Sequence, residues 1–506
     1  MNGYRRPGGA GSENGSLALV LHSHMPYVEG FGTWPFGEEW LWEAVATVYL
    51  PLLETLAGAP VTLGLTPVLC DQIETLTGPA GERFLAFMRE VRAPLHADDA
   101  RGLDAGGEHA AATEVRRAAG DYAIAERTFA GLGGDLLGAL SELVAGATGP
   151  ELLGSAATHA ILPLLATAGG RRLQIDAGLN AHERRFGHRP RGFWLPECAY
   201  EAGLEDLLSE AGTRAFCVDQ TNALGLGALE QLEPVRTPAG PVAVPIDWST
   251  VALVWDEHSG YPAHGRYRNY HGRTVHDLKP WDNYGAIYDH EAARGLAAEH
   301  ARDFLSRCAS RLGDYRAQRG RPGLLCCPLD TELLGHWWYE GQTWLATVLG
   351  EAEAHGVELL PLSQALERVE PVEGRELSPS SWGAPKDLTT WDSPRVAELV
   401  VAARRAELEL VTATSAARGV AATDDGSPAR PALERAAREL LALQSSDWAF
   451  LETRELAAEY PLERARAHVR ELDAALAAAV ADSDAEPDPG LRNLAPELDL
   501  RPLLAP

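Results

Sequence analysis

Short apolar segments separated by longer, helix-like stretches recur along the first three quarters of the chain. Each segment is bounded by Gly, Pro or polar residues, which is typical of a buried strand. The segments lie at residues 17–21, 60–65, 151–155, 192–197, 215–219, 242–246, 323–329 and 357–361. Strands that alternate with helices predict an α/β fold, a parallel barrel whose loops carry function.

Two regions depart from this alternation. From about residue 81 to 149 the chain is rich in Ala, Leu, Glu and Arg with helical periodicity, which predicts a helical insertion between barrel strands. Residues 396–416 and 432–443 predict a C-terminal helical bundle, interrupted at 419–431 by a polar segment that we expect to be a mobile loop. We therefore expect these units: a disordered tail at 1–16, a barrel at 17–370, a helical domain at 371–480, and a tail or strap at 481–506.

Composition narrows the class of protein. The 506 residues carry 44 basic and 72 acidic side chains, a net charge of −28, which argues against nucleic acid or an anionic membrane as partner. A neutral polymer is compatible with this acidic surface, although acidity by itself mostly reflects solubility. No secretory signal stands at residues 1–14, and no apolar stretch is long enough to cross a bilayer.

The cysteines point to the compartment. Six are present, none with Cys-x-x-Cys spacing, and several stand inside apolar runs (Cys70, Cys198, Cys217, Cys308, Cys326 and Cys327). Such cysteines are typical of buried thiols in a reducing environment, not of a disulfide or zinc framework. The sequence therefore predicts a cytoplasmic protein.

Two acidic residues stand at strand ends among tryptophans and prolines. Glu197 follows Gly-Phe-Trp-Leu-Pro, and Asp330 follows Cys-Cys-Pro-Leu. The C-terminal strand ends of barrels carry chemistry, and two carboxylates placed there suit cleavage of a glycosidic bond. Structural alternatives remain open: Glu197 could pair with an arginine, and Asp330 could cap a helix that begins at Thr331. Glu332 and His336 are competitors of Asp330 for the catalytic role.

Histidines and tryptophans add two further hypotheses. His22 and His24 alternate on an extended segment, so their imidazoles face one side and could form a zinc site with His159 and His336. The same imidazoles could instead hydrogen-bond sugar hydroxyls. Trp382 and Trp391 lie in Gly-, Pro- and Ser-rich segments, which favours a binding surface, although a tryptophan is more often a core residue. The segment with Asp447 and Trp448 either contacts a ligand or caps a helix.

Eight motifs in the same order along the chain resemble glycoside hydrolase family 57, particularly its 1,4-α-glucan branching enzyme group. The resemblance extends from Leu17 to about His468. Its motifs are His22–Tyr27, Ser155–His159, Gly192–Tyr200, Val254–Trp255 with Gly260–Pro262, Pro328–Trp338, Ser380–Gly383, Trp391 and Gln444–Trp448.

This resemblance implies a (β/α)7 barrel with an inserted helical region and a C-terminal α-helical domain closing over the cleft. It implies a retaining mechanism without metal or cofactor, with Glu197 as nucleophile, Asp330 as general acid/base and an α-1,4-glucan as partner. The implied substrate-binding residues are His22, His24 and His159 at the point of cleavage, Trp255, Trp382, Trp391 and Trp448 along the glucan path, and His336, Trp337 and Asp447 beside them.

The sequence departs from the family in the loop that favours transfer of the glucan over its hydrolysis. Branching enzymes of the family carry a loop with a tyrosine over the site, but residues 220–240 contain none. Trp281, Tyr284 or Tyr288 are candidate substitutes. An α-amylase or a 4-α-glucanotransferase on the same scaffold is therefore the alternative to a branching enzyme. A non-catalytic glucan-binding protein and a zinc-dependent hydrolase or deacetylase are the alternatives from other classes.

Overall fold

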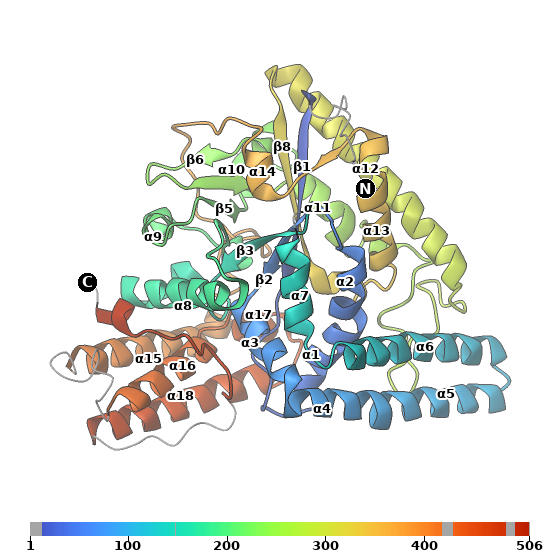
Figure 1. Ribbon diagram of the computed structural model, residues 1–506, viewed down its shortest axis with the longest axis horizontal. Coiled ribbons are helices and arrows are strands. Elements are labelled where there is room, and N and C mark those ends of the chain that lie inside the picture. Colours follow the sequence, from blue (N-terminus) through green and yellow to red (C-terminus); the bar gives the residue numbers. More distant parts are fainter. Residues whose placement is uncertain (1–12, 147, 417–428, 482–490, 505–506) are drawn as a thin grey trace.

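The computed structural model describes residues 13–146, 148–416, 429–481 and 491–504 (Figure 1). Its centre is a sheet in which parallel strands follow the order β7-β5-β4-β3-β2-β1-β8. Their bounds are β1 (Gly15–Ser23), β2 (Thr62–Leu65), β3 (Glu151–Ser155), β4 (Gly192–Trp194), β5 (Ala215–Val218), β7 (Val242–Pro245) and β8 (Gly323–Asp330). The backbone N–H of Asp247 donates to the carbonyl of Cys326 at 2.8 Å, which links the end of β7 to β8. The predicted (β/α)7 barrel is confirmed.

Two short strands lie outside this ring. β9 (Glu358–Leu359) pairs with β1 at Ser16 and Leu17. It corresponds to the strand predicted at 357–361 but is shorter. β6 (Val235–Arg236) runs antiparallel to β7 and was not predicted. Because β6 has two residues, it is too short to give a periodic signal.

The continuous apolar character of the strands has a structural cause. Along β1, Ala18 and Val20 belong to a buried cluster with other barrel residues such as Cys217 and Cys326. The alternate residues Leu17, Leu19 and Leu21 belong to a second cluster, which includes residues of the surrounding helices. Both faces of each strand are therefore buried, as expected where helices cover a parallel sheet. All six cysteines are free and buried.

The segment between β2 and β3 is helical, as predicted, but its helices begin earlier than residue 81. Phe84 and Phe129 pack edge to face at 4.7 Å and join two of these helices. Figure 1 shows the longest pair, α5 and α6, side by side at the lower right. The helices of the insertion are α3 (Pro67–Glu74), α4 (Pro79–Ala86), α5 (Ala93–Ala105), α6 (His109–Gly131) and α7 (Leu136–Ala145).

The C-terminal region forms the predicted helical bundle, at the lower left of Figure 1. Its helices are α15 (Ala397–Ala416), α16 (Ala429–Leu443), α17 (Ser446–Arg454) and α18 (Tyr460–Val480). Residues 491–504 pack back onto this bundle, with Leu494 and Leu503 buried, and the N–H of Asn493 donates to the Tyr27 hydroxyl at 3.1 Å. This part of the predicted tail is therefore a strap.

Some predicted boundaries fall on residues outside the described part. They are most of the tail at 1–16, most of the loop at 419–431, and residues 482–490, 505 and 506.

The remaining helices surround the barrel (Figure 1). They are α1 (Glu38–Ala44), α2 (Leu50–Thr55), α8 (Ala168–Phe186), α9 (Leu204–Glu210), α10 (Thr221–Leu224), α11 (Trp248–Trp255), α12 (His290–Arg319), α13 (Gly341–Glu351) and α14 (Leu362–Leu366). Among the described helices, none combines the length and the apolar character that crossing a membrane requires.

Candidate active site

A large cavity, which we call the central cavity, includes residues at the C-terminal ends of the barrel strands. Its volume is about 2260 Å³. Glu197 and Asp330 line it from the barrel, Tyr122 lines it from the helical insertion, and Asp447 lines it from α17. A ligand in the central cavity is therefore contacted by all three parts of the chain.

Glu197 lies in a strained turn directly after β4. Its φ is +58° and that of Cys198 is +50°, so two consecutive non-glycine residues adopt the left-handed conformation. His159, which lies beside Glu197, also has a positive φ of +58°. Each such residue costs about 1 kcal/mol or more, and strain of this kind concentrates at functional sites. The local conformation singles out this turn as functional.

The Glu197 carboxylate is held by hydrogen-bond donors from distant segments. The indole N–H of Trp382 donates to Oε2 at 2.7 Å, and the hydroxyl of Ser446 donates to Oε1 at 3.3 Å. His159 Nδ1 lies 3.6 Å from Oε1. Burial raises the pKa of Glu197 to about 7, and the Trp382 and Ser446 bonds oppose this rise by favouring the carboxylate. The alternative in which Glu197 pairs with an arginine is not observed among the described residues.

Asp330 has a contrasting environment. It is the last residue of β8 and pairs with His22 of β1 in the sheet register. Its carboxyl group makes no hydrogen bond within the described part of the chain, and it does not cap the turn at Thr331–Leu333. Burial, together with the charges of Glu332 and Glu197, raises the pKa of Asp330 well above its usual value. These surroundings favour the protonated form of Asp330.

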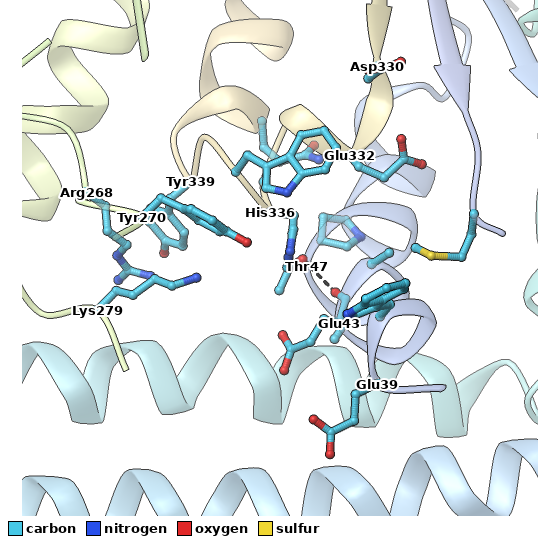
Figure 2. Close-up of a pocket in the computed structure, with 18 of the residues that line it drawn as sticks. Glu39, Glu43, Thr47, Arg268, Tyr270, Lys279, Asp330, Glu332, His336 and Tyr339 are labelled. Atoms are coloured by element: carbon cyan, nitrogen blue, oxygen red, sulfur yellow. Dashed lines mark hydrogen bonds between the residues drawn. The ribbon is translucent and has the colours of Figure 1, made fainter. Parts of the chain in front are cut away.

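Glu332 is another carboxyl group of the central cavity, near Asp330 (Figure 2). The hydroxyl of Tyr49 donates to its Oε1 at 2.5 Å, and the backbone N–H of His24 donates to the same atom at 3.2 Å. Burial raises the pKa of Glu332 to about 7 despite these donors. Because its Oε1 already accepts two hydrogen bonds, Glu332 is less available to a substrate than Asp330.

Three of the predicted histidines stack together at the same strand ends. The rings of His24 and His159 are 4.1 Å apart, and those of His22 and His159 are 4.9 Å apart. His24 Nε2 lies 2.9 Å from Asp447. Burial lowers the pKa of His24, but the charge and hydrogen bond of Asp447, together with the charges of Glu197 and Glu332, raise it overall. Burial lowers the pKa of His22 and of His159 well below the usual value. The surroundings of the stack therefore favour the protonated form at His24 and the neutral form at His22 and His159.

This stack does not have the geometry of a zinc site. Both ring nitrogens of His24 are engaged, Nδ1 with Thr66 at 3.2 Å and Nε2 with Asp447. Within the described ranges, no three side chains of the ligating types are placed to hold a metal ion. His22 Nδ1 and His159 Nε2 are buried and have no hydrogen-bond partner there.

Comparisons with known proteins agree with this geometry. The profile of glycosyl hydrolase family 57 matches residues 18–247, and that of the C-terminal region of 1,4-α-glucan branching enzymes matches residues 404–496. A probable 1,4-α-glucan branching enzyme of Mycobacterium tuberculosis is 36% identical over 502 residues, covering 93% of this chain and 94% of that protein. The chain belongs to glycosyl hydrolase family 57.

Solved structures of the family have the same architecture. The branching enzyme of Pyrococcus horikoshii is 30% identical and superposes with a TM-score of 0.88 over 97% of both chains. A family 57 branching enzyme of Thermococcus kodakaraensis, solved in complex with glucose, is also 30% identical, with a TM-score of 0.87 over 97% of this chain and 96% of that one. The family resemblance inferred from the motifs is confirmed.

Most of the tryptophans predicted to line the glucan path line the central cavity, and one lies in the core instead. Trp255 and Trp337 are 40% and 41% exposed, pack edge to face at 6.2 Å and line the central cavity. Trp382 lines it beside Glu197, and Trp391 lines it although it is 2% exposed. Trp448 lies in the helical core, where its N–H donates to the carbonyl of Ala442 at 2.8 Å, and it does not line the cavity.

His336 and Asp447 both line the central cavity. Asp447 lies in the first turn of α17, and Ser445 of the same segment occupies the N-cap position without a side-chain capping bond. The segment therefore both begins a helix and lines the cavity. Burial lowers the pKa of His336 to about 4, so its imidazole is neutral. The ring of His336 lies 5.8 Å from that of Tyr270 and 6.1 Å from that of Trp337.

The residues expected to supply a lid tyrosine do not reach the central cavity. Residues 220–240 do not line the central cavity, and neither do the candidate substitutes Trp281, Tyr284 and Tyr288. Tyr270, which sequence reasoning did not select, does line it (Figure 2). Lys279 and Lys386 were missed as well, and both line the cavity. The signal that could have found the lysines is their rarity, since the chain contains no others.

Proposed function

We propose that this chain is a retaining 1,4-α-glucan branching enzyme, which cleaves an α-1,4 linkage and transfers the glucan to a 6-hydroxyl. The observation that carries the proposal is the pair of contrasting carboxyl groups in one cavity. Glu197 is held by donors that favour its ionised form, whereas Asp330 is buried without a donor and beside other carboxylates. A nucleophile and a proton donor require this difference. The branching enzymes among its relatives support the choice of reaction.

The reaction follows from these two environments. Asp330 gives its proton to the glycosidic oxygen while Glu197 attacks the anomeric carbon, so the bond from that carbon to the oxygen breaks and a glycosyl ester forms. The leaving glucan fragment departs with a free 4-hydroxyl at its new non-reducing end. Asp330, now ionised, takes the proton of an acceptor 6-hydroxyl, whose oxygen displaces Glu197. The two inversions restore the α configuration.

We assign the surrounding residues to the donor sugar. The stacked rings of His22, His24 and His159 line the cavity and form one wall of the donor-sugar site. The His24 ring is fixed by its bonds to Thr66 and Asp447. Trp382, which also packs edge to face on Trp194 at 4.9 Å, presents an apolar wall beside Glu197. A non-catalytic binding protein would not need two buried acids, because burying an ionisable group destabilises the fold.

Hydrolysis is the competing function, because residues 220–240 place no tyrosine at the central cavity. In the test, the protein is incubated with amylose and the product is then debranched with isoamylase. A branching enzyme keeps the number of reducing ends constant and yields new short chains only after debranching. Reducing sugar that rises before debranching identifies an amylase instead. The variant Glu197→Gln serves as the control and should lose every glucan-converting activity.

We also propose a cytoplasmic location, supported by six buried free thiols. The proposed partner is an α-1,4-glucan. The acidic surface, with a net charge of −28, argues against nucleic acid as a further partner.

A further inference from the structure

Lysine is nearly absent from this chain. Of its 44 basic residues, 42 are arginines, and the two lysines are Lys279 and Lys386. Both lysines line the central cavity, whereas only five of the 42 arginines do. An ammonium group is smaller than a guanidinium, rotates freely and offers three donors from one point. The two positions that use lysine are therefore candidates for a task that arginine does not perform.

Lys386 has a complete set of partners. Its ammonium lies 3.0 Å from Asp219 Oδ2, donates to the Trp382 carbonyl at 2.8 Å and lies over the ring of Trp248. Trp382 in turn donates to Glu197. Lys386 therefore fixes the backbone at Trp382, the residue that positions the nucleophile. Its ammonium is fully engaged by these partners and is not available to a ligand.

Lys279 has the opposite character. Its ammonium lies 3.9 Å from the ring centroid of Tyr270 and makes no hydrogen bond or ion pair with any residue in the described ranges. Figure 2 shows its side chain pointing toward the space between Tyr270 and His336. Burial lowers the pKa of Lys279 to about 8. An unpaired, partly desolvated ammonium in a cavity is expected to bind a ligand oxygen.

The position of Lys279 relative to the two acids identifies which sugar it meets. Asp330, Glu332, His336 and Trp337 belong to β8 and the segment that follows it, and Tyr270 contacts both His336 and Trp337. Lys279 therefore lies on the side of the cavity that carries the general acid/base. In a double displacement this group serves the leaving glucan and then the incoming one, so its side holds the acceptor.

We propose that Lys279 and Tyr270 form a binding site for the acceptor glucan chain. The exposed face of Trp337 packs against a pyranose ring, and the Lys279 ammonium and the Tyr270 hydroxyl bind its hydroxyls. The ammonium over the Tyr270 ring also fixes the ring's orientation by a cation–π contact. A glucan acceptor gains binding energy from these contacts that an attacking water molecule does not, so the site favours transfer over hydrolysis. This inference rests on the proposed branching function and names the acceptor contacts within it.

The test separates cleavage from transfer. The donor is α-maltotetraosyl fluoride, whose fluoride leaving group is too small to occupy an acceptor site, and maltoheptaose is the added acceptor. For Lys279→Met we expect fluoride release without acceptor to stay within about twofold of wild type. We expect the acceptor KM to rise about tenfold, the cost of one hydrogen bond to a charged group, and the products to shift toward hydrolysis. Tyr270→Leu should act in the same direction.

Two controls make the result specific. Arg294→Met removes a cavity-lining cation that is 53% exposed on α12, and it should leave the acceptor KM unchanged. Lys279→Arg should recover part of the affinity. In wild type, the acceptor KM should rise above about pH 8 as the ammonium loses its proton, and in Lys279→Arg this rise should disappear. The charged and titratable groups that face Lys279 are Asp277, Glu43, Arg273, Arg92, Tyr270 and His336.

A binding experiment distinguishes failure of this inference from failure of the branching proposal. Titration of maltoheptaose into Glu197→Gln and into Glu197→Gln with Lys279→Met measures affinity without turnover. Weaker binding by the double variant supports the site even if the wild-type protein proves to be an amylase. Equal binding, with an unchanged acceptor KM and unchanged partition between transfer and hydrolysis, overturns the inference even if branching is observed.

Discussion

The two sides of the central cavity each carry a carboxyl group that burial affects, but they differ in the hydrogen bonds and charges around it. Glu197 and Asp330 are both removed from water, which by itself raises the pKa of each. On the Glu197 side, donors from Trp382 and Ser446 favour the carboxylate. On the Asp330 side, the described residues provide no donor, and Glu332 and Glu197 add negative charge. The difference in role therefore comes from hydrogen bonds and neighbouring charges, because burial is common to both.

The two sides also differ in where their residues come from along the chain. Trp382 and Ser446 are 185 and 249 positions from Glu197. On the Asp330 side, the charge with the largest effect on the carboxyl group, that of Glu332, stands only two positions along the chain. The nucleophile side thus depends on docking of the C-terminal region, whereas the acid side is mostly local.

The largest expected effect separates the roles of the two acids directly. Glu197→Gly and Asp330→Ala should each lower the turnover of amylose by roughly 10⁴-fold or more. With α-maltotetraosyl fluoride and azide, Glu197→Gly should give the β-glycosyl azide, because azide attacks the donor directly. Asp330→Ala should give the α-glycosyl azide, because azide attacks the glycosyl ester. NMR of the anomeric proton distinguishes the products, and interchanged configurations would reverse the assignment.

The next effect concerns the strongest donor on the nucleophile side. Trp382→Phe keeps the aromatic wall but removes the 2.7 Å bond to Glu197, so the turnover rate should fall by about tenfold to a hundredfold. Because the lost donor favoured the ionised carboxylate, the pKa of Glu197 should rise above its present value of about 7. The acid limb of the pH–rate profile should therefore move to higher pH. Trp391→Phe is the matched control, since the Trp391 N–H has no partner among the described residues and its loss should leave this limb in place.

A third prediction changes the charge on the acid side. Glu332→Gln removes a negative charge that raises the pKa of Asp330, so this pKa should fall. Asp330 acts in its protonated form, and the alkaline limb of the pH–rate profile should move to lower pH. Glu332→Asp keeps the charge and should leave the limb closer to its wild-type position. An alkaline limb that is identical in all three proteins would show that Asp330 does not sense Glu332.

The smallest effect is expected at Ser446. Its bond to Glu197 is long, 3.3 Å, and its hydroxyl is also within 2.9 Å of His159. Ser446→Ala should lower the turnover rate by about threefold, as expected for one weak neutral hydrogen bond. The melting temperature, measured in parallel, should change little. A loss as large as that of Trp382→Phe would mean that Ser446, and not Trp382, is the main donor to the nucleophile.

The strands and the two acids could be predicted from the sequence because both depend on local patterns. Continuous apolar runs mark strands that are buried on both faces, and Glu197 and Asp330 stand where such runs end. The same reasoning found the helical insertion and the C-terminal helices from their periodicity. Strand β6 escaped because two residues carry no periodic signal.

The cavity wall was less predictable because it depends on how distant segments pack. Trp448 belongs to a family motif, yet its side chain packs into the helical core. Tyr270 faces the cavity, whereas Tyr288, in the same part of the chain, is buried away from it. No local pattern distinguishes these aromatic residues, since the direction of each side chain follows from a loop conformation that only the fold defines.

The scarcity of lysine has a practical consequence for handling this protein. Apart from the α-amino terminus, its primary amines lie in the central cavity, and that of Lys279 has a pKa of about 8, well below that of an ordinary surface lysine. Apart from the α-amino group, amine-directed crosslinkers, dyes and aldehyde resins would therefore find their targets inside the catalytic cavity. Immobilisation through surface carboxylates, of which the chain has an abundance, avoids that damage.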